Sequence, residues 1–154
     1  MKTVILAGGF GTRLNNSLEK MPKPMAMIGN KPIIWHIMKH FSNYELNDFH
    51  IALGYKKEAI VDYFLNYKRF SSDLKINLKS NKITYFENDI PDWNISLFDT
   101  GNNSMTGGRV LRIKSHLKDT FILTYGDGLA NINVNELINF HKSHGKLITV
   151  TAVR

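Results

Sequence analysis

The sequence has no cysteine among its 154 residues. Disulfide bonds, a thiolate nucleophile and cysteine-ligated metal sites are therefore excluded. Long hydrophobic runs are also missing, because the apolar stretch near the N-terminus covers only residues 4–7 before Gly8, and no segment reaches the ~20 apolar residues that cross a bilayer. These absences predict a cytoplasmic protein that has neither a signal peptide nor a membrane as its partner.

Acidic residues are fewer than basic ones. The chain has 20 Lys and Arg residues against 13 Asp and Glu residues, which gives a net charge of +7 and a pI of about 9.6. A basic surface suits nucleic acids, and it equally suits small anions such as nucleotides and sugar phosphates. The lysines are scattered and no nucleic-acid-binding motif accompanies them, so we expect small anionic substrates and no nucleic-acid partner.

Short apolar runs alternate with segments of helical periodicity along the chain. We expect strands at residues 2–7, 48–55, 83–86, 95–99, 120–125 and 147–153, and helices at residues 31–44, 58–67, 108–117 and 134–144. This alternation predicts an α/β fold, with a Rossmann-like, mainly parallel sheet and helices on both faces. Ligands of such folds bind beyond the carboxyl ends of the strands, which directs attention to the loops after Ala7 and Tyr125.

The loop after the first strand is rich in glycine and reads GGFGTR over residues 8–13. Glycines allow the backbone to come close to a phosphate chain, whose charge the loop amides can neutralise. It is not a dinucleotide fingerprint, because Leu14 stands at the third glycine position, and it lacks the G-K-[ST] ending of a P-loop. Arg13 offers a planar fork for phosphate oxygens, and Lys23, between two prolines, offers a compact cation. With both cations present, a phosphate-binding loop is a better interpretation than a plain turn.

A second candidate lies after the apolar run at residues 121–125, where Asp127 stands between two glycines. A Gly-Asp-Gly sequence alone is most often a turn. On a parallel sheet, however, this turn emerges beside the glycine-rich loop, and a carboxylate there is a suitable hard ligand for Mg²⁺. Arg109 is a third candidate, because a helix start is an unfavourable place for a cation, which favours a contact with a ligand.

The pattern L-A-G-G-x-G-T-R-L followed by P-K-P resembles the signature of the sugar nucleotidyltransferases. The segments at residues 35–39, 54–56, 99–101, 105–109, 124–128, 140–142 and 149–153 extend the resemblance over essentially the whole chain. The resemblance implies catalytic roles for Arg13, Lys23 and Asp127, with Asp127 as a Mg²⁺ ligand. It implies a nucleotide site formed by Leu6, Ala7, Gly8, Gly9, Phe10, Gly11, Thr12, Arg13, Lys23, Ser104, Thr106, Gly107, Arg109 and Gly126.

Within that family the match points to members that use CTP and glucose 1-phosphate and form CDP-glucose and pyrophosphate with Mg²⁺ as cofactor. The phosphate of such a sugar is largely dianionic at neutral pH, since its second pKa is near ~6, so it needs no general base. No covalent enzyme nucleophile is required either, which agrees with the lack of a Ser-His-Asp pattern and of cysteine.

The end of the chain limits this interpretation. It stops directly after the last predicted strand, so we expect residues 1–154 to be the N-terminal, nucleotide-binding portion of a nucleotidyltransferase domain. The sugar-binding C-terminal portion, with the family's second metal-binding aspartate, would then be absent. Two alternatives stay open: a nucleotidyltransferase for another nucleotide and sugar phosphate, or a truncated, non-catalytic nucleotide-binding domain. Self-association of a full-length form also stays open.

Overall fold

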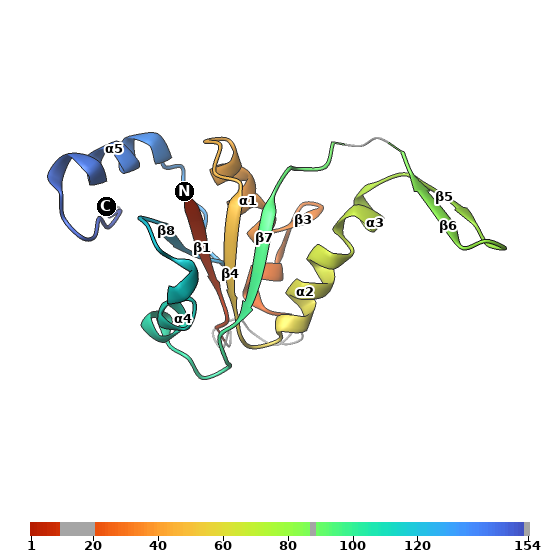
Figure 1. Cartoon of the computed structure of the whole chain (residues 1–154), viewed down its shortest axis with the longest axis horizontal. Helices are drawn as coiled ribbons and strands as arrows, with labels where there is room; N and C mark the ends of the chain where they lie inside the picture. The colour runs from red at the N-terminus through yellow and green to blue at the C-terminus, as the bar shows by residue number, and fades with distance from the viewer. Residues whose placement is uncertain (10–20, 87–88, 153–154) are drawn as a thin grey trace.

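The fold is built on a parallel sheet of four strands in the order β7-β4-β1-β8 (Figure 1). The computed structural model describes residues 1–9, 21–86 and 89–152. The strands are β1 (Lys2–Ala7), β4 (Asp48–Leu53), β7 (Asn94–Asp99) and β8 (Ile122–Tyr125). The central strands β1 and β4 are buried on both faces, which explains their nearly continuous apolar sequences. The predicted α/β class and mainly parallel sheet are therefore confirmed.

The register of the strands brings their carboxyl ends into one row. Ala7 of β1 pairs with Leu53 of β4, Leu53 pairs with Asp99 of β7, and Leu6 pairs with Tyr125 of β8. The four loops that follow these strands consequently start side by side at one edge of the sheet. This is the edge at which parallel α/β folds bind their ligands.

One face of the sheet is covered by α1 (Ile33–Ser42) and α2 (Lys57–Leu65). The apolar side of α1 carries Ile34, Ile37, Met38 and Phe41 at helical spacing. These residues and Ile60 of α2 form one buried cluster with Ile5 and Ala7 of β1 and Phe49, Ile51 and Leu53 of β4. The predicted helix at residues 31–44 begins only at Ile33, because Pro32 cannot continue a hydrogen-bonded helix toward the N-terminus.

The opposite face is covered by α4 (Thr106–Arg112) and the 3₁₀ turn η2 (Lys114–His116). The ring of His116 lies 4.7 Å from Phe98 of β7, and Lys2 Nζ donates to the His116 carbonyl at 2.6 Å. Helices on both faces are thus confirmed. The single helix expected at residues 108–117 is divided at Ile113, whose side chain is buried and whose backbone (φ −103°, ψ 7°) leaves the helical region.

The last helix, α5 (Val134–His144), agrees with the predicted bounds. Asn133 caps it: its side-chain oxygen accepts the Glu136 amide at 3.2 Å, and its side-chain amide donates to the Glu136 carboxylate at 2.9 Å. The helix ends at Gly145, whose positive φ of 62° suits glycine.

The strand predicted at residues 147–153 is wrong over the described residues 147–152, which contain no strand. This segment turns back onto the end of α5, where Thr149 Oγ1 lies 2.8 Å from both His141 Nδ1 and His144 Nε2. Because it does not extend along β8, its apolar side chains gain no cover, and Leu147 is 98% exposed. An alternating apolar pattern forms a strand only where a neighbouring strand pairs with it.

A small hairpin projects from the end of the fold opposite to α5 (Figure 1). After α2, the short helix α3 (Tyr67–Ser71) leads to β5 (Leu74–Asn77) and β6 (Lys82–Tyr85), which pair antiparallel. The strand predicted at residues 83–86 is therefore present, but outside the main sheet, and β5 was not predicted. Near the N-terminus lie the 3₁₀ turn η1 (Lys23–Met25) and the two-residue strands β2 (Met27–Ile28) and β3 (Lys31–Pro32). No helix in the described ranges is long and apolar enough to span a membrane.

Candidate functional site

A pocket of about 310 Å³ opens at the carboxyl edge of the sheet. It is lined by the end of β1 and its loop, by η1, by the loop between β7 and α4, and by the turn after β8. The glycine-rich loop and the acidic turn, which are about 120 positions apart in the sequence, therefore face a common space, as the sheet topology requires.

The pocket brings together many of the predicted site residues. Those that line it are Leu6, Ala7, Gly9, Lys23, Ser104, Thr106, Arg109 and Asp127. Gly8, Gly107 and Gly126 lie directly next to lining residues but do not line it themselves. Phe10, Gly11, Thr12 and Arg13 lie outside the described residues. Met105 and Tyr125, which were not predicted as site residues, also line the pocket and are 82% and 60% exposed.

Lys23 and Asp127 form the charged pair of this pocket. Lys23 Nζ lies 3.7 Å from Asp127 Oδ2, and their side chains are 27% and 42% exposed. The position of Lys23 is set by η1, which is anchored by the buried side chains of Pro24 and Met25 and closed by a hydrogen bond from the Met25 amide to the Pro22 carbonyl at 2.8 Å. A cation and a carboxylate thus share one partly exposed position beside the glycine-rich loop.

Gly126 allows the turn that carries Asp127 to lie close to β1 and η1. Its amide donates to the Leu6 carbonyl at 2.9 Å, and a Cβ at this position would lie 3.0 Å from both that oxygen and Cγ of Pro24. A side chain at this position would therefore be in tight contact with β1 and η1, which the glycine avoids. The glycine before Asp127 places its carboxylate next to Lys23.

The chemistry of this pair suits a nucleotide and a divalent cation. Lys23 offers three donors to phosphate oxygens. Mg²⁺ in proteins commonly takes one or two carboxylates and completes its octahedron with water and substrate phosphates. In the described ranges no group of three or more His, Asp or Glu side chains could hold a metal. Asp127 therefore fits a metal that the phosphates of a ligand help to hold, and does not fit a closed structural metal site.

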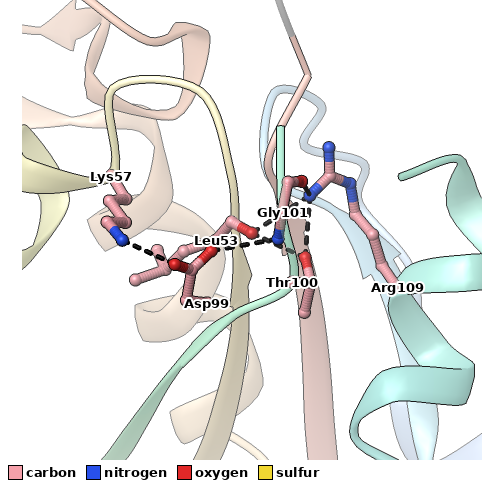
Figure 2. A network of polar contacts seen from close by, with 6 residues as sticks. All are labelled: Leu53, Lys57, Asp99, Thr100, Gly101 and Arg109. Atoms are coloured by element: carbon pink, nitrogen blue, oxygen red, sulfur yellow. Dashed lines mark hydrogen bonds and ion pairs between the residues drawn. The ribbon is translucent and has the colours of Figure 1, made fainter. Parts of the chain in front are cut away.

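Arg109 lines the pocket although it is only 5% exposed. Figure 2 shows its guanidinium reaching from α4 toward the ends of the strands. Nη1 donates to the Leu53 carbonyl (3.0 Å), Thr100 Oγ1 (2.7 Å) and the Gly101 carbonyl (2.8 Å), and Nη2 donates to the carbonyls of Gly8 (2.7 Å) and Asn102 (3.2 Å). We call these contacts the Arg109 network. Burial lowers the pKa of Arg109, which still stays a cation. Its predicted contact with a nucleotide stays a prediction.

The roles of Thr100 in this network and of the adjacent Gly54 were not predicted from the sequence. Thr100 is completely buried and its hydroxyl donates to the Leu53 carbonyl at 2.6 Å. Gly54 follows Leu53, and a Cβ there would lie 2.5 Å from Arg109 Nη1. The segments at residues 54–56 and 99–101 did match the family pattern, but nothing in a linear sequence indicates that a guanidinium 101 positions away binds the Gly8 carbonyl.

An exposed ion pair supports the same edge of the sheet from outside. Lys57 Nζ at the start of α2 lies 2.5 Å from Asp99 Oδ2 at the end of β7, and Asp99 Oδ1 accepts the Gly101 amide at 3.0 Å (Figure 2). The hydrogen bond from Lys57, followed by the one from the Gly101 amide, holds the pKa of Asp99 below its ordinary value. The carboxylate form is therefore favoured by folding.

We expect this ion pair to stabilise the protein at neutral pH and to lose its effect in acid. A carboxyl whose pKa is lower in the folded state contributes stability above its unfolded pKa of ~3.9, and that contribution disappears as the pH falls through the folded value. Thermal unfolding of the wild type and of Asp99→Asn between about pH 7 and about pH 2 should show a Tm difference that shrinks to zero. A difference independent of pH would contradict the assignment to the carboxylate charge.

Comparison with known proteins places this geometry in context. The Nucleotidyl transferase family matches residues 2–154. Glucose-1-phosphate cytidylyltransferase of Salmonella typhimurium is 47% identical over 154 residues, and the probable glucose-1-phosphate cytidylyltransferase of Bacillus subtilis is 45% identical over 155 residues. Each alignment covers 99% of this chain and 60% of the relative. The chain thus spans about three-fifths of the length of these relatives.

Solved structures share the fold at lower identity. HddC from Yersinia pseudotuberculosis complexed with GMP-PN superposes with a TM-score of 0.68 at 22% identity, covering 91% of this chain and 53% of HddC. A UDP-glucose pyrophosphorylase complexed with UDP-glucose gives a TM-score of 0.67 at 20% identity, covering 94% and 54%. These likenesses establish the fold of the sheet and its helices.

Proposed function

The chain belongs to the nucleotidyl transferase family, and from this premise we propose that it binds CTP and glucose 1-phosphate and forms CDP-glucose and pyrophosphate. The observation that carries the proposal is the position of Lys23 and Asp127, 3.7 Å apart, in a pocket that the loop after β1 also lines. The choice of substrates rests on relatives that are 45–47% identical and bear the name glucose-1-phosphate cytidylyltransferase. Because the chain spans 60% of their length, its own activity and substrates are part of the proposal.

The reaction joins two anions and needs no proton transfer from the protein. A phosphate oxygen of glucose 1-phosphate attacks the α-phosphorus of CTP, a new P–O bond forms, the bond from the α-phosphorus to the bridging oxygen breaks, and pyrophosphate leaves with that electron pair. The attacking phosphate is already largely dianionic at neutral pH. The protein's task is to align the two reactants and to neutralise their charge.

The residues of the pocket divide this task. Lys23 offsets negative charge on the reacting phosphates, and its position on η1 keeps it beside Asp127. The main chain at Ala7 and Gly9 also lines the pocket and offers the approach for the phosphate chain. Arg13, outside the described residues, adds a second cation on the same loop. Asp127 would hold Mg²⁺, which when bound neutralises phosphate oxygens.

The loop between β7 and α4 also lines the pocket, and we place the nucleoside beside it. Met105 of this loop and Tyr125 at the end of β8 present exposed apolar surface to the pocket, and Thr106 stands at the start of α4. Apolar side chains suit the faces of a base, while hydroxyl and main-chain groups suit its edges. The match of residues 105–109 to the family pattern motivates the choice of cytosine.

Calorimetry with Mg²⁺ and CTP, ATP or GTP tests the binding part of this proposal. We expect CTP to bind most tightly, and equal or absent binding of all three nucleotides would reject the assignment. Pyrophosphate release with CTP and a panel of sugar 1-phosphates, for this chain and for a version extended to the length of its relatives, tests the transfer. Binding without release by either version would instead identify a non-catalytic nucleotide-binding domain. Release with a different nucleotide or sugar would identify another member of the family.

A further inference from the structure

The Arg109 guanidinium is a buried cation that binds no carboxylate in the described part of the chain. Its five partners are the carbonyl oxygens of Gly8, Leu53, Gly101 and Asn102 and the hydroxyl of Thr100. These oxygens belong to the segments that follow or end three different parallel strands, β1, β4 and β7. Burying a cation this deeply is costly, and only a complete set of hydrogen bonds offsets that cost.

Glycines leave the space that the guanidinium fills. A Cβ at Gly8 would lie 2.2 Å from Arg109 Nη1 and 2.3 Å from Cζ, so nothing larger than glycine fits while the guanidinium is in place. A Cβ at Gly54 would lie 2.5 Å from Nη1 and 2.7 Å from the Gly8 carbonyl oxygen. Neither glycine has a positive φ. At these two positions the small residue serves the approach of Arg109 and not an unusual backbone conformation.

We infer that Arg109 is a positioning residue, which fixes the distance between the main chain at residues 8–9, after β1, and the β7–α4 loop and so sets the pocket for a nucleotide of any base. The identity of the ligand, a nucleotide, rests on the proposed function. Both segments line the pocket, Ala7 and Gly9 at the end of β1 and residues 102–106 between β7 and α4. Nη2 donates to the carbonyl of Gly8, between Ala7 and Gly9, and to the carbonyl of Asn102, so a single group joins the two segments.

Arg109→Lys keeps the positive charge and removes the planar guanidinium. The single ammonium group of lysine cannot reach the acceptors that lie on both sides of the guanidinium. We expect the Kd values for CTP, ATP and inorganic triphosphate, each with Mg²⁺, to rise by the same factor of about tenfold. A direct contact with the base would instead weaken CTP alone and leave triphosphate unchanged, which would overturn the inference. Arg112→Lys, on the exposed side of the same helix, is the matched control and should leave all three Kd values unchanged.

A double-mutant cycle of Gly8→Ala and Arg109→Lys tests whether Gly8 is needed to make room for the guanidinium. The three nearest atoms that the new Cβ would meet, among the described residues, belong to the Arg109 side chain, so Gly8→Ala alone should displace the guanidinium and raise Kd as Arg109→Lys does. The double variant should bind as the single variants do, because lysine leaves that space free. If the two increases in Kd multiply, Gly8 acts on the ligand independently and the coupling to Arg109 is refuted.

Amide hydrogen exchange without ligand separates this inference from the proposed function. The Thr100 amide donates to the Leu53 carbonyl at 3.0 Å, and that carbonyl also accepts from Arg109. We expect faster exchange at Thr100 in Arg109→Lys and unchanged exchange in Arg112→Lys. If the wild type binds no nucleotide while exchange responds in this way, the proposed function fails and the positioning role stands. If nucleotides bind but neither exchange nor Kd responds to Arg109→Lys, the positioning role fails and the proposed function stands.

Discussion

Replacing Asp127 by asparagine is expected to abolish the effect of Mg²⁺ on CTP binding by this chain. In a version extended to the length of its relatives, the same change is expected to reduce pyrophosphate release by about a thousandfold or more. Asparagine has the size of aspartate and lacks its negative charge. It is therefore a poor ligand for Mg²⁺, which prefers charged oxygens.

The fold should tolerate this substitution. The Asp127 side chain is 42% exposed, and its ion-pair partner in the described part of the chain is Lys23, at 3.7 Å. The turn is held by the main-chain bond from Gly126 to Leu6, which asparagine leaves in place. Exposed ion pairs of this kind contribute only about 0–1 kcal/mol, so the Tm should change little.

The measurement compares CTP titrations with and without Mg²⁺, and initial rates of pyrophosphate release, for the wild type and Asp127→Asn. Asp119→Asn is the control: this exposed aspartate lies just before β8, outside the pocket, and the same chemical change there should alter neither quantity. Retained Mg²⁺-dependent turnover in Asp127→Asn would remove this residue from the metal site.

Much of the sheet and the meeting of its loops could be predicted because both depend on local patterns. The apolar runs of β1 and β4 predict strands buried on both faces, and the bounds of β1 agree with the prediction. The parallel topology then brings every carboxyl end to one edge, so the meeting of the loop after β1 with the turn that carries Asp127 follows from the order of the elements. No knowledge of side-chain conformations was needed for this step.

The remaining features depend on long-range contacts that a linear pattern does not contain. Residues 147–152 have a strand-like sequence but bind the end of α5 through Thr149, so the local preference is overridden. In the described residues β5 and β6 pair only with each other, and of these two strands only β6 was predicted. The Arg109 network joins residues up to 101 positions apart. The sequence placed Arg109 at a helix start and favoured a contact with a ligand, whereas α4 begins at Thr106, Arg109 lies in its last turn, and the acceptors in the described residues belong to the protein.

The glycines of the site have more than one structural reason, and the sequence indicated only one of them. The glycine-rich loop was interpreted as space for a phosphate chain, and Gly9 does line the pocket with nothing within 4 Å of a Cβ. Gly8 and Gly126, in contrast, leave space for Arg109, for Leu6 and for Pro24. The same residue type thus borders the open pocket at Gly9 and makes room for protein atoms at Gly8 and Gly126.

Replacing Lys23 by methionine is expected to lower the rate of pyrophosphate release by about a hundredfold to a thousandfold in the extended version. Methionine keeps much of the length and apolar character of the side chain and removes its charge. The buried Pro24 and Met25 continue to anchor η1, so the position of residue 23 should be preserved. The loss then reports the cation that Lys23 contributes beside the reacting phosphates.

The expected effect of Lys23→Met on the affinity for Mg²⁺ is not the loss expected for Asp127→Asn, and this difference distinguishes the roles of the two residues. In the structure the Lys23 ammonium lies 3.7 Å from the carboxylate that would hold the metal, so the two cations compete for Asp127. Lys23→Met should therefore leave the affinity for Mg²⁺ undiminished or increase it while kcat falls. Lys118→Met, an exposed lysine outside the pocket, serves as the control for loss of one positive charge. A parallel loss of Mg²⁺ affinity and kcat in Lys23→Met would mean that this lysine supports the metal site, and that its proposed contact with the phosphates is wrong.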